Sequence, residues 1–247
     1  MKGGEPFFYK RGKKGVLLLH GFSSTSQEFR ELGAYLAKKN ITVYAPLLEG
    51  HGTHPEFLAK TNKKDWIKSG EEGLKFLRKH CDTVFVGGNS IGGNIAIILA
   101  SHHKVEGLIS LATPIIFRQQ RILGKLSLLI FIIGQFKIFK KKRYMKKWPQ
   151  IAKKRIMYDI LPLNCSRDVF KLMKFSSECL PKVDEPALLM QSTTDHLVEE
   201  ENIEYMKKHL GSKKIEIKFI PDSYHVFIVD HHKKMAFKKI YQFIKEN

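Results

Sequence analysis

Cysteine is scarce in this chain of 247 residues, and a long hydrophobic run is missing. The three cysteines are scattered and none forms a C-x-x-C spacing, which excludes a disulfide framework and favours a reducing compartment. The longest apolar stretch, Leu126–Ile133, is too short to cross a bilayer. The N-terminal segment MKGGEPFFYKRGKKG lacks the apolar core of a signal peptide, so we expect a cytoplasmic protein.

Acidic residues are also few, because 24 Asp and Glu stand against 43 Lys and Arg, giving a formal charge of +19. Such a charge suits nucleic acid, an anionic membrane surface or a solvated lysine surface. The chain carries no zinc-finger, RNP-type or bZIP pattern, so we expect no specific nucleic-acid partner and favour the solvated surface. Hydrophobic residues make up 43%, enough for one large domain with an insertion.

The stretch 82–101, DTVFVGGNSIGGNIAIILAS, organises the rest of the chain. The β-branched run 83–86 predicts a buried strand, and the apolar run 95–100 predicts a helix. Between them stands G-x-S-x-G with Ser90 at its centre, the arrangement of a nucleophile elbow. Glycines are needed there because a serine on so tight a turn leaves no room for neighbouring side chains. The alternative is a glycine-rich turn without chemistry.

Strands and helices alternate along the chain, which predicts an α/β fold with a doubly wound, mostly parallel sheet. Ser26 is a candidate N-cap for the first helix. Ligands in such sheets bind beyond the carboxyl ends of the strands. The polar loops all fall near such ends, at His20, His51, Ser90, Asp195 and His225. The expected strands are 15–20, 41–45, 83–86, 108–112, 187–191 and 215–220, and the expected helices are 27–39, 65–80, 95–100, 200–210 and 230–244.

Residues 114–182 break the alternation and are too long for an ordinary loop. We therefore expect a core formed by 1–113 and 183–247, and an inserted basic and apolar helical cap over the strand ends. The apolar stretch 122–139 either buries against the core and lines an acyl pocket, or docks on an anionic membrane with the help of the cations in 140–147.

A serine hydroxyl becomes a nucleophile only when a base takes its proton, and histidine suits that task near neutral pH. His225 is the best-placed base, since it lies between the last strand and the last helix. Asp195 directly follows a buried strand and is the expected partner that orients the imidazole. Asp222 is a weaker candidate because it is too close to His225 in sequence to reach the ring easily. The order Ser90, Asp195, His225 is the one expected on this sheet.

A tetrahedral intermediate needs two donors for its oxyanion. The N–H of Ile91, directly after the serine, is one candidate, and the N–H of Phe22, after the first central strand, is the other. Phe22 is also suited to lining an acyl pocket. For His51 we favour a plain turn residue over a residue that orients the loop. We expect no cofactor-binding or metal-binding residues.

These stretches together resemble the α/β-hydrolase superfamily, specifically small bacterial carboxylesterases and monoacylglycerol lipases. The resemblance rests on LLLHGFSS, APLLEGHGTHPEFL, Asp65-Trp66, GNSIGG, STTDHLV and SYHVFIVD, and it covers most of the chain outside 114–182. It implies a catalytic triad of Ser90, Asp195 and His225 with oxyanion donors at Phe22 and Ile91. Asn89 departs from the family, which often has leucine there, and the cap is longer and more basic than expected.

The sequence thus predicts a serine hydrolase that cleaves carboxylic esters through an acyl-enzyme, acting on short- to medium-chain acyl esters or monoacylglycerols. A thioesterase or a cinnamoyl-type esterase would use the same machinery and remains an alternative. A catalytically idle hydrolase fold serving as a binding module is disfavoured because all three triad residue types are present.

Overall fold

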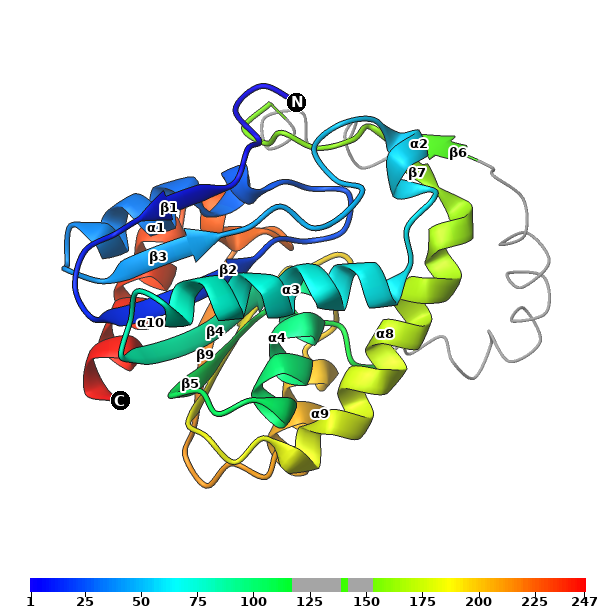
Figure 1. The fold of residues 1–247 in the computed structure, drawn as a ribbon. Helices are drawn as coiled ribbons and strands as arrows, with labels where there is room; N and C mark the ends of the chain where they lie inside the picture. The colour runs from blue at the N-terminus through cyan, green and yellow to red at the C-terminus, as the bar shows by residue number, and fades with distance from the viewer. Residues whose placement is uncertain (117–138, 142–152) are drawn as a thin grey trace.

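A seven-stranded sheet forms the centre of the molecule, in the order β1-β3-β2-β4-β5-β8-β9 (Figure 1). The computed structural model describes residues 1–116, 139–141 and 153–247. Only β1 runs antiparallel, against β3, and all other neighbours in this sheet are parallel, as the alternation predicts. The strands are β1 Phe7–Tyr9, β2 Lys14–Leu19, β3 Thr42–Ala45, β4 Thr83–Asn89, β5 Gly107–Leu111, β8 Ala187–Ser192 and β9 Ile215–Ile220.

Helices cover both faces of this sheet (Figure 1). Helices α1 (Arg30–Ala37) and α10 (Lys233–Glu246) pack on one face. Helices α3 (Lys63–Arg78), α4 (Ile91–His102) and α9 (Glu201–His209) pack on the other. The sheet therefore separates two apolar cores, the arrangement of a doubly wound fold.

Strand β2 shows how the sequence builds both cores. Its side chains alternate, with Leu17 and Leu19 in the core under α3 and α4, and Val16 and Leu18 in the core under α1 and α10. All four are completely buried. A strand covered on both faces needs apolar residues at every position, which explains the unbroken run in the sequence.

The insertion contributes helix α8 (Ser166–Cys179), which packs against α4. A two-stranded sheet pairs β6 (Phe139–Lys141) with β7 (Ile160–Pro162). Most of the apolar stretch and the basic cluster discussed above lies in 117–138 and 142–152, outside the described residues. No helix in the described part of the chain has both the length and the apolar character that a membrane crossing requires.

Several local predictions need correction. Ser26 does not cap a helix, because its hydroxyl donates to the Pro46 carbonyl and it opens the 3-10 helix η1 (Ser26–Phe29) instead. Helix α3 begins two residues before Asp65, because Asn62 caps it and Asp65 returns a bond to the Asn62 N–H. Strand β1 and four short helices are absent from the expected elements. The helices are α2 (Pro55–Leu58), η2 (Leu163–Cys165), η3 (Leu180–Lys182) and η4 (Phe227–Val229).

Candidate active site

Ser90 occupies a strained turn between β4 and α4. Its backbone angles, φ 56° and ψ −124°, are ones that a residue with a side chain rarely adopts and that cost about 1–3 kcal/mol. Two glycines make the turn possible. A Cβ on Gly88 would lie 2.2 Å from the Gly92 carbonyl, and one on Gly92 would lie 1.9 Å from the Leu19 oxygen. The strand continues through both preceding glycines to Asn89, three residues beyond the predicted end.

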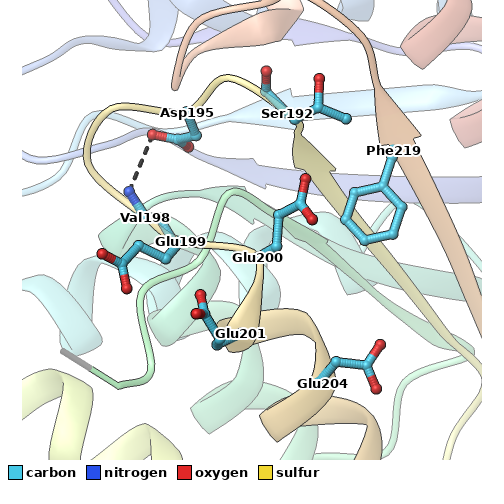
Figure 2. Close-up of a pocket in the computed structure, with 9 residues that line it drawn as sticks. Ser192, Asp195, Val198, Glu199, Glu200, Glu201, Glu204 and Phe219 are labelled. Atoms are coloured by element: carbon cyan, nitrogen blue, oxygen red, sulfur yellow. Dashed lines mark hydrogen bonds between the residues drawn. The ribbon is translucent and has the colours of Figure 1, made fainter. Parts of the chain in front are cut away.

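Asp195 and His225 meet at the neighbouring strand ends. His225 Nδ1 lies 2.8 Å from Asp195 Oδ2, and the Asp195 side chain is 1% exposed. Asp195 also accepts hydrogen bonds from the Leu197 N–H and from Gln191 Nε2. It accepts another from the Val198 N–H (Figure 2). Together with the bond to His225, these hydrogen bonds hold the Asp195 carboxylate in one orientation.

The electrostatics of Asp195 determine the tautomer of His225. Burial would raise the pKa of the Asp195 carboxyl, but the adjacent His225 ring and the N–H groups of Leu197 and Val198 outweigh burial and hold that pKa below its ordinary value. The carboxylate is therefore ionised near neutral pH and can only accept. His225 Nδ1 must then be the donor, which leaves Nε2 as the ring atom able to take a proton.

Asp222, the weaker candidate for the acid, is exposed and adopts a left-handed φ of 42°. Among the described residues no hydrogen bond joins the Ser90 hydroxyl to the His225 ring, although β4, β5, β8 and β9 are consecutive in the sheet and their carboxyl ends share one edge. Such bonds are often long until substrate is bound.

The loop after β2 lies against the serine. A Cβ on Gly21 would be 3.5 Å from the Ser90 Cβ. The Gly21 carbonyl accepts from His20 Nδ1 at 2.9 Å and from the Ser24 N–H at 3.1 Å. The N–H of Phe22 belongs to the same peptide plane as this carbonyl and points the opposite way. It has no hydrogen-bond partner within the described chain, so it is available to an oxyanion.

His51 is not a plain turn residue, contrary to the interpretation favoured from the sequence. It is 2% exposed, and its ring lies edge-on to those of His20, Phe22 and Trp66, with centroids 4.9, 6.0 and 6.3 Å away. Phe22 is also edge-on to Trp66 at 5.6 Å. These rings form an aromatic wall behind the loop that carries the candidate oxyanion donor.

A pocket of about 490 Å³ is lined in part by Asp195 (Figure 2). Phe219 and Val198 supply its apolar lining, while Glu199, Glu200, Glu201 and Glu204 supply carboxylates. An apolar acyl chain would find few partners there, so we do not place the acyl group in it. Among the described residues no group of three or more His, Cys, Asp or Glu is arranged to hold a metal ion.

Comparison with known proteins gives consistent relatives. A family model described as serine aminopeptidase, S33, matches residues 10–232. A thermostable monoacylglycerol lipase from Bacillus sp. (strain H-257) is 32% identical over 100% of this chain and 96% of its own length. A carboxylesterase from Bacillus subtilis (strain 168) is 25% identical over 98% and 96%. A solved structure of metagenome-derived lipolytic enzymes matches with a TM-score of 0.85 at 24% identity, covering 100% of this chain and 99% of that one.

The burial of His20 against His51 has a testable consequence for stability. It is completely buried, and burial lowers its pKa from 6.5 to about 4. Between those values the unfolded chain binds a proton that the folded chain does not. The free energy of unfolding should therefore fall as pH drops from 6.5 to 4, by up to about 3 kcal/mol, since one pKa unit is worth about 1.4 kcal/mol.

The measurement is denaturant unfolding at several pH values in the wild type and in His20→Asn. Asparagine keeps a donor for the Gly21 carbonyl but does not titrate, so the variant should lose this share of the pH dependence, whatever its absolute stability. Parallel curves for the two proteins across pH 6.5 to 4 would contradict the assignment.

Proposed function

The chain belongs to the serine aminopeptidase S33 family of α/β hydrolases, and we propose that it hydrolyses carboxylic esters with Ser90 as nucleophile. The relatives named above are a monoacylglycerol lipase and a carboxylesterase, which favours ester over peptide substrates. We propose short- to medium-chain acyl esters or monoacylglycerols as the substrate class. The observation that carries the proposal is the left-handed Ser90 on the strand-to-helix turn, at the same sheet edge as the Asp195–His225 pair.

In the proposed reaction, Ser90 Oγ attacks the ester carbonyl carbon while His225 Nε2 takes the hydroxyl proton. Asp195 keeps the ring in the required tautomer and stabilises its charge. The oxyanion accepts hydrogen bonds from the N–H groups of Phe22 and Ile91. When the tetrahedral intermediate collapses, His225 gives its proton to the departing alcohol and the acyl-enzyme remains. Water then attacks the acyl-enzyme by the same steps, releasing the carboxylic acid and restoring Ser90.

We also propose the division into a core of 1–113 and 183–247 and a cap of 114–182. Helix α8, from the cap, lies on α4 and near α3, so this part of the cap is anchored beside the elbow helix. A cap placed there would set which acyl chains reach the serine.

The first prediction of the proposed function concerns Ser90. A fluorophosphonate probe should label this residue, and Ser90→Ala should abolish labelling and lower turnover of p-nitrophenyl esters by about 10⁴-fold or more, because the nucleophile acts as a unit with its base. A series of esters of graded chain length measures the preferred acyl group in the same assay. Labelling that persists in Ser90→Ala would refute the assignment.

The second prediction concerns the two partners of the serine. His225→Ala should cost about as much turnover as Ser90→Ala, and Asp195→Asn about 10⁴-fold, because the amide no longer enforces the required tautomer. Asp222→Asn is the matched control, since Asp222 is exposed and lies in the same loop as His225. It should retain near-normal turnover. Loss of activity in Asp222→Asn with activity retained in Asp195→Asn would reverse the assignment of the acid.

We further propose weak contact between the cap and an anionic membrane surface. The sequence supplies six cations within 140–147, each worth about 1 kcal/mol near such a surface. The described residues add Phe57 on α2, which is 56% exposed with Lys60 Nζ 5.5 Å from its ring centroid. Helix α2 packs against β7 of the cap. An exposed aromatic ring beside cations suits a lipid interface.

Sedimentation with anionic and with neutral liposomes tests this proposal. Binding should occur only to the anionic set, fade as salt rises, and drop when the six cations are changed to glutamine. A control variant with six exposed lysines elsewhere changed to glutamine should bind as the wild type does. Equal, negligible binding to both liposome sets would leave the cap as a pocket wall. The six cations are Lys140, Lys141, Lys142, Arg143, Lys146 and Lys147, and the control lysines are Lys79, Lys104, Lys213, Lys234, Lys238 and Lys245.

A further inference from the structure

One buried carboxylate near the site has no part in the proposed reaction. Glu28, in the turn that follows the loop after β2, has a completely buried side chain. Its Oε1 accepts the Gly21 N–H at 2.9 Å, and its Oε2 accepts the Ser24 hydroxyl at 2.6 Å. Arg155 donates to the same Oε2 at 3.2 Å. A carboxyl group at this depth is costly unless donors satisfy it, and this one accepts three hydrogen bonds.

The bonds of Glu28 act on the segment that carries the candidate oxyanion donor. Glu28 holds the Gly21 N–H, while His20 and Ser24 hold the Gly21 carbonyl. Both peptide planes that meet at Gly21 are therefore fixed, and the second of them contains the Phe22 N–H. A glycine would otherwise leave this pair of planes free to rotate. Glu28 therefore acts on the Phe22 N–H in two ways: it holds the preceding peptide plane, and its Oε2 accepts the hydroxyl of Ser24, whose N–H holds the second plane.

Arg155 reaches Glu28 from a segment far away in the sequence. Residues 154–158, here called the return segment, belong to the cap and precede its strand β7. The return segment bonds along the whole loop: Thr25 Oγ1 donates to the Ile156 carbonyl at 2.8 Å, and the Tyr158 N–H donates to the Ser23 carbonyl at 2.9 Å. Gln27 bonds to it twice, through the Lys154 carbonyl and the Ile156 N–H.

Arginine is the cation suited to this position. Its side chain is 8% exposed, and one guanidinium nitrogen lies 3.2 Å both from Glu28 Oε2 and from Ser24 Oγ. The planar guanidinium therefore fixes the carboxylate and the hydroxyl together, which a flexible ammonium group does less well. The return segment in this way brings a counter-ion from the cap to the catalytic loop.

We infer that Glu28 is a positioning residue that aims the Phe22 N–H at the oxyanion, with Arg155 of the return segment fixing its carboxylate. The inference rests on the proposed function, since it assigns Phe22 as an oxyanion donor. A positioning role predicts a change in kcat at constant KM, whereas a purely structural role predicts a change in stability alone. Misaiming an oxyanion donor weakens binding of the tetrahedral state but not of the ground-state ester, so kcat falls while KM holds.

The test is Glu28→Gln, assayed with a p-nitrophenyl ester at a temperature where all variants are folded. The amide removes the charge and one acceptor oxygen. We expect kcat to fall about tenfold to a hundredfold, less than for complete loss of a donor, with KM within about threefold. Affinity for an alkyl trifluoromethyl ketone, whose adduct with Ser90 carries an oxyanion, should fall by the same factor as kcat/KM. Titration with a fluorophosphonate normalises each rate to the number of reactive serines.

Glu216→Gln is the matched control. Glu216 pairs with Lys239 between β9 and α10, with side chains 22% and 25% exposed, so its loss also breaks a partly buried ion pair. Its kcat should stay at the wild-type level whatever its melting temperature. Arg155→Lys is a second variant that keeps the charge, and it should lower kcat about threefold to tenfold at constant KM, even if Glu28→Gln does not fold.

The outcomes separate this inference from the proposed function. An active wild type whose activity needs Ser90, together with unchanged kcat and ketone affinity in folded Glu28→Gln, would overturn the positioning role alone. If Glu28→Gln does not fold, an unchanged kcat in Arg155→Lys has the same consequence. A wild type without Ser90-dependent esterase activity would instead overturn the proposed function. A rise in KM with constant kcat in Glu28→Gln would also contradict the inference.

Discussion

The rest of the site depends on how closely the backbone of the elbow approaches the end of β2. Gly92 packs against the Leu19 carbonyl so tightly that a single added carbon would overlap it. This contact brings the first turn of α4 and the loop after β2 together, and we propose that each of them supplies one oxyanion donor. The strain in the Ser90 backbone is tolerated because β4 and α4 are both deeply buried and cannot relax.

Ion pairs in the described residues range widely in burial. Pairs such as Lys13–Asp82 and Lys68–Glu72 have side chains that are about two-thirds exposed or more, and pairs of that kind contribute little to stability. In contrast, Arg155–Glu28 and His225–Asp195 have every side chain less than a tenth exposed. Burying charges costs desolvation energy that apolar residues would avoid. Both pairs lie at the carboxyl edge of the sheet, where orientation of a donor or a base matters more than stability.

The sequence predicts well those features that are encoded by neighbouring residues. The unbroken apolar run of β2 and the glycines around Ser90 each lie within a few consecutive residues. The mostly parallel sheet and the α/β-hydrolase family follow from the alternation and the motifs, and both are confirmed. Local capping was less predictable, because Ser26 and Asn62 are both residue types that favour N-caps, yet only Asn62 caps a helix, while the Ser26 hydroxyl bonds to the distant Pro46 carbonyl.

Features that join distant residues were not predictable. Glu28 and Arg155 are 127 residues apart, and nothing in either local sequence marks them as partners. The sequence favours a plain turn residue for His51, yet the aromatic wall formed with Phe22 and Trp66 buries it. Gln191, which donates to Asp195, lies within a strand whose pattern predicts only burial. In each case the residue contacts a proposed catalytic group, or the loop that carries one, only after the sheet has assembled. The residues that carry the chemistry leave a motif in the sequence, whereas the residues that aim them do not.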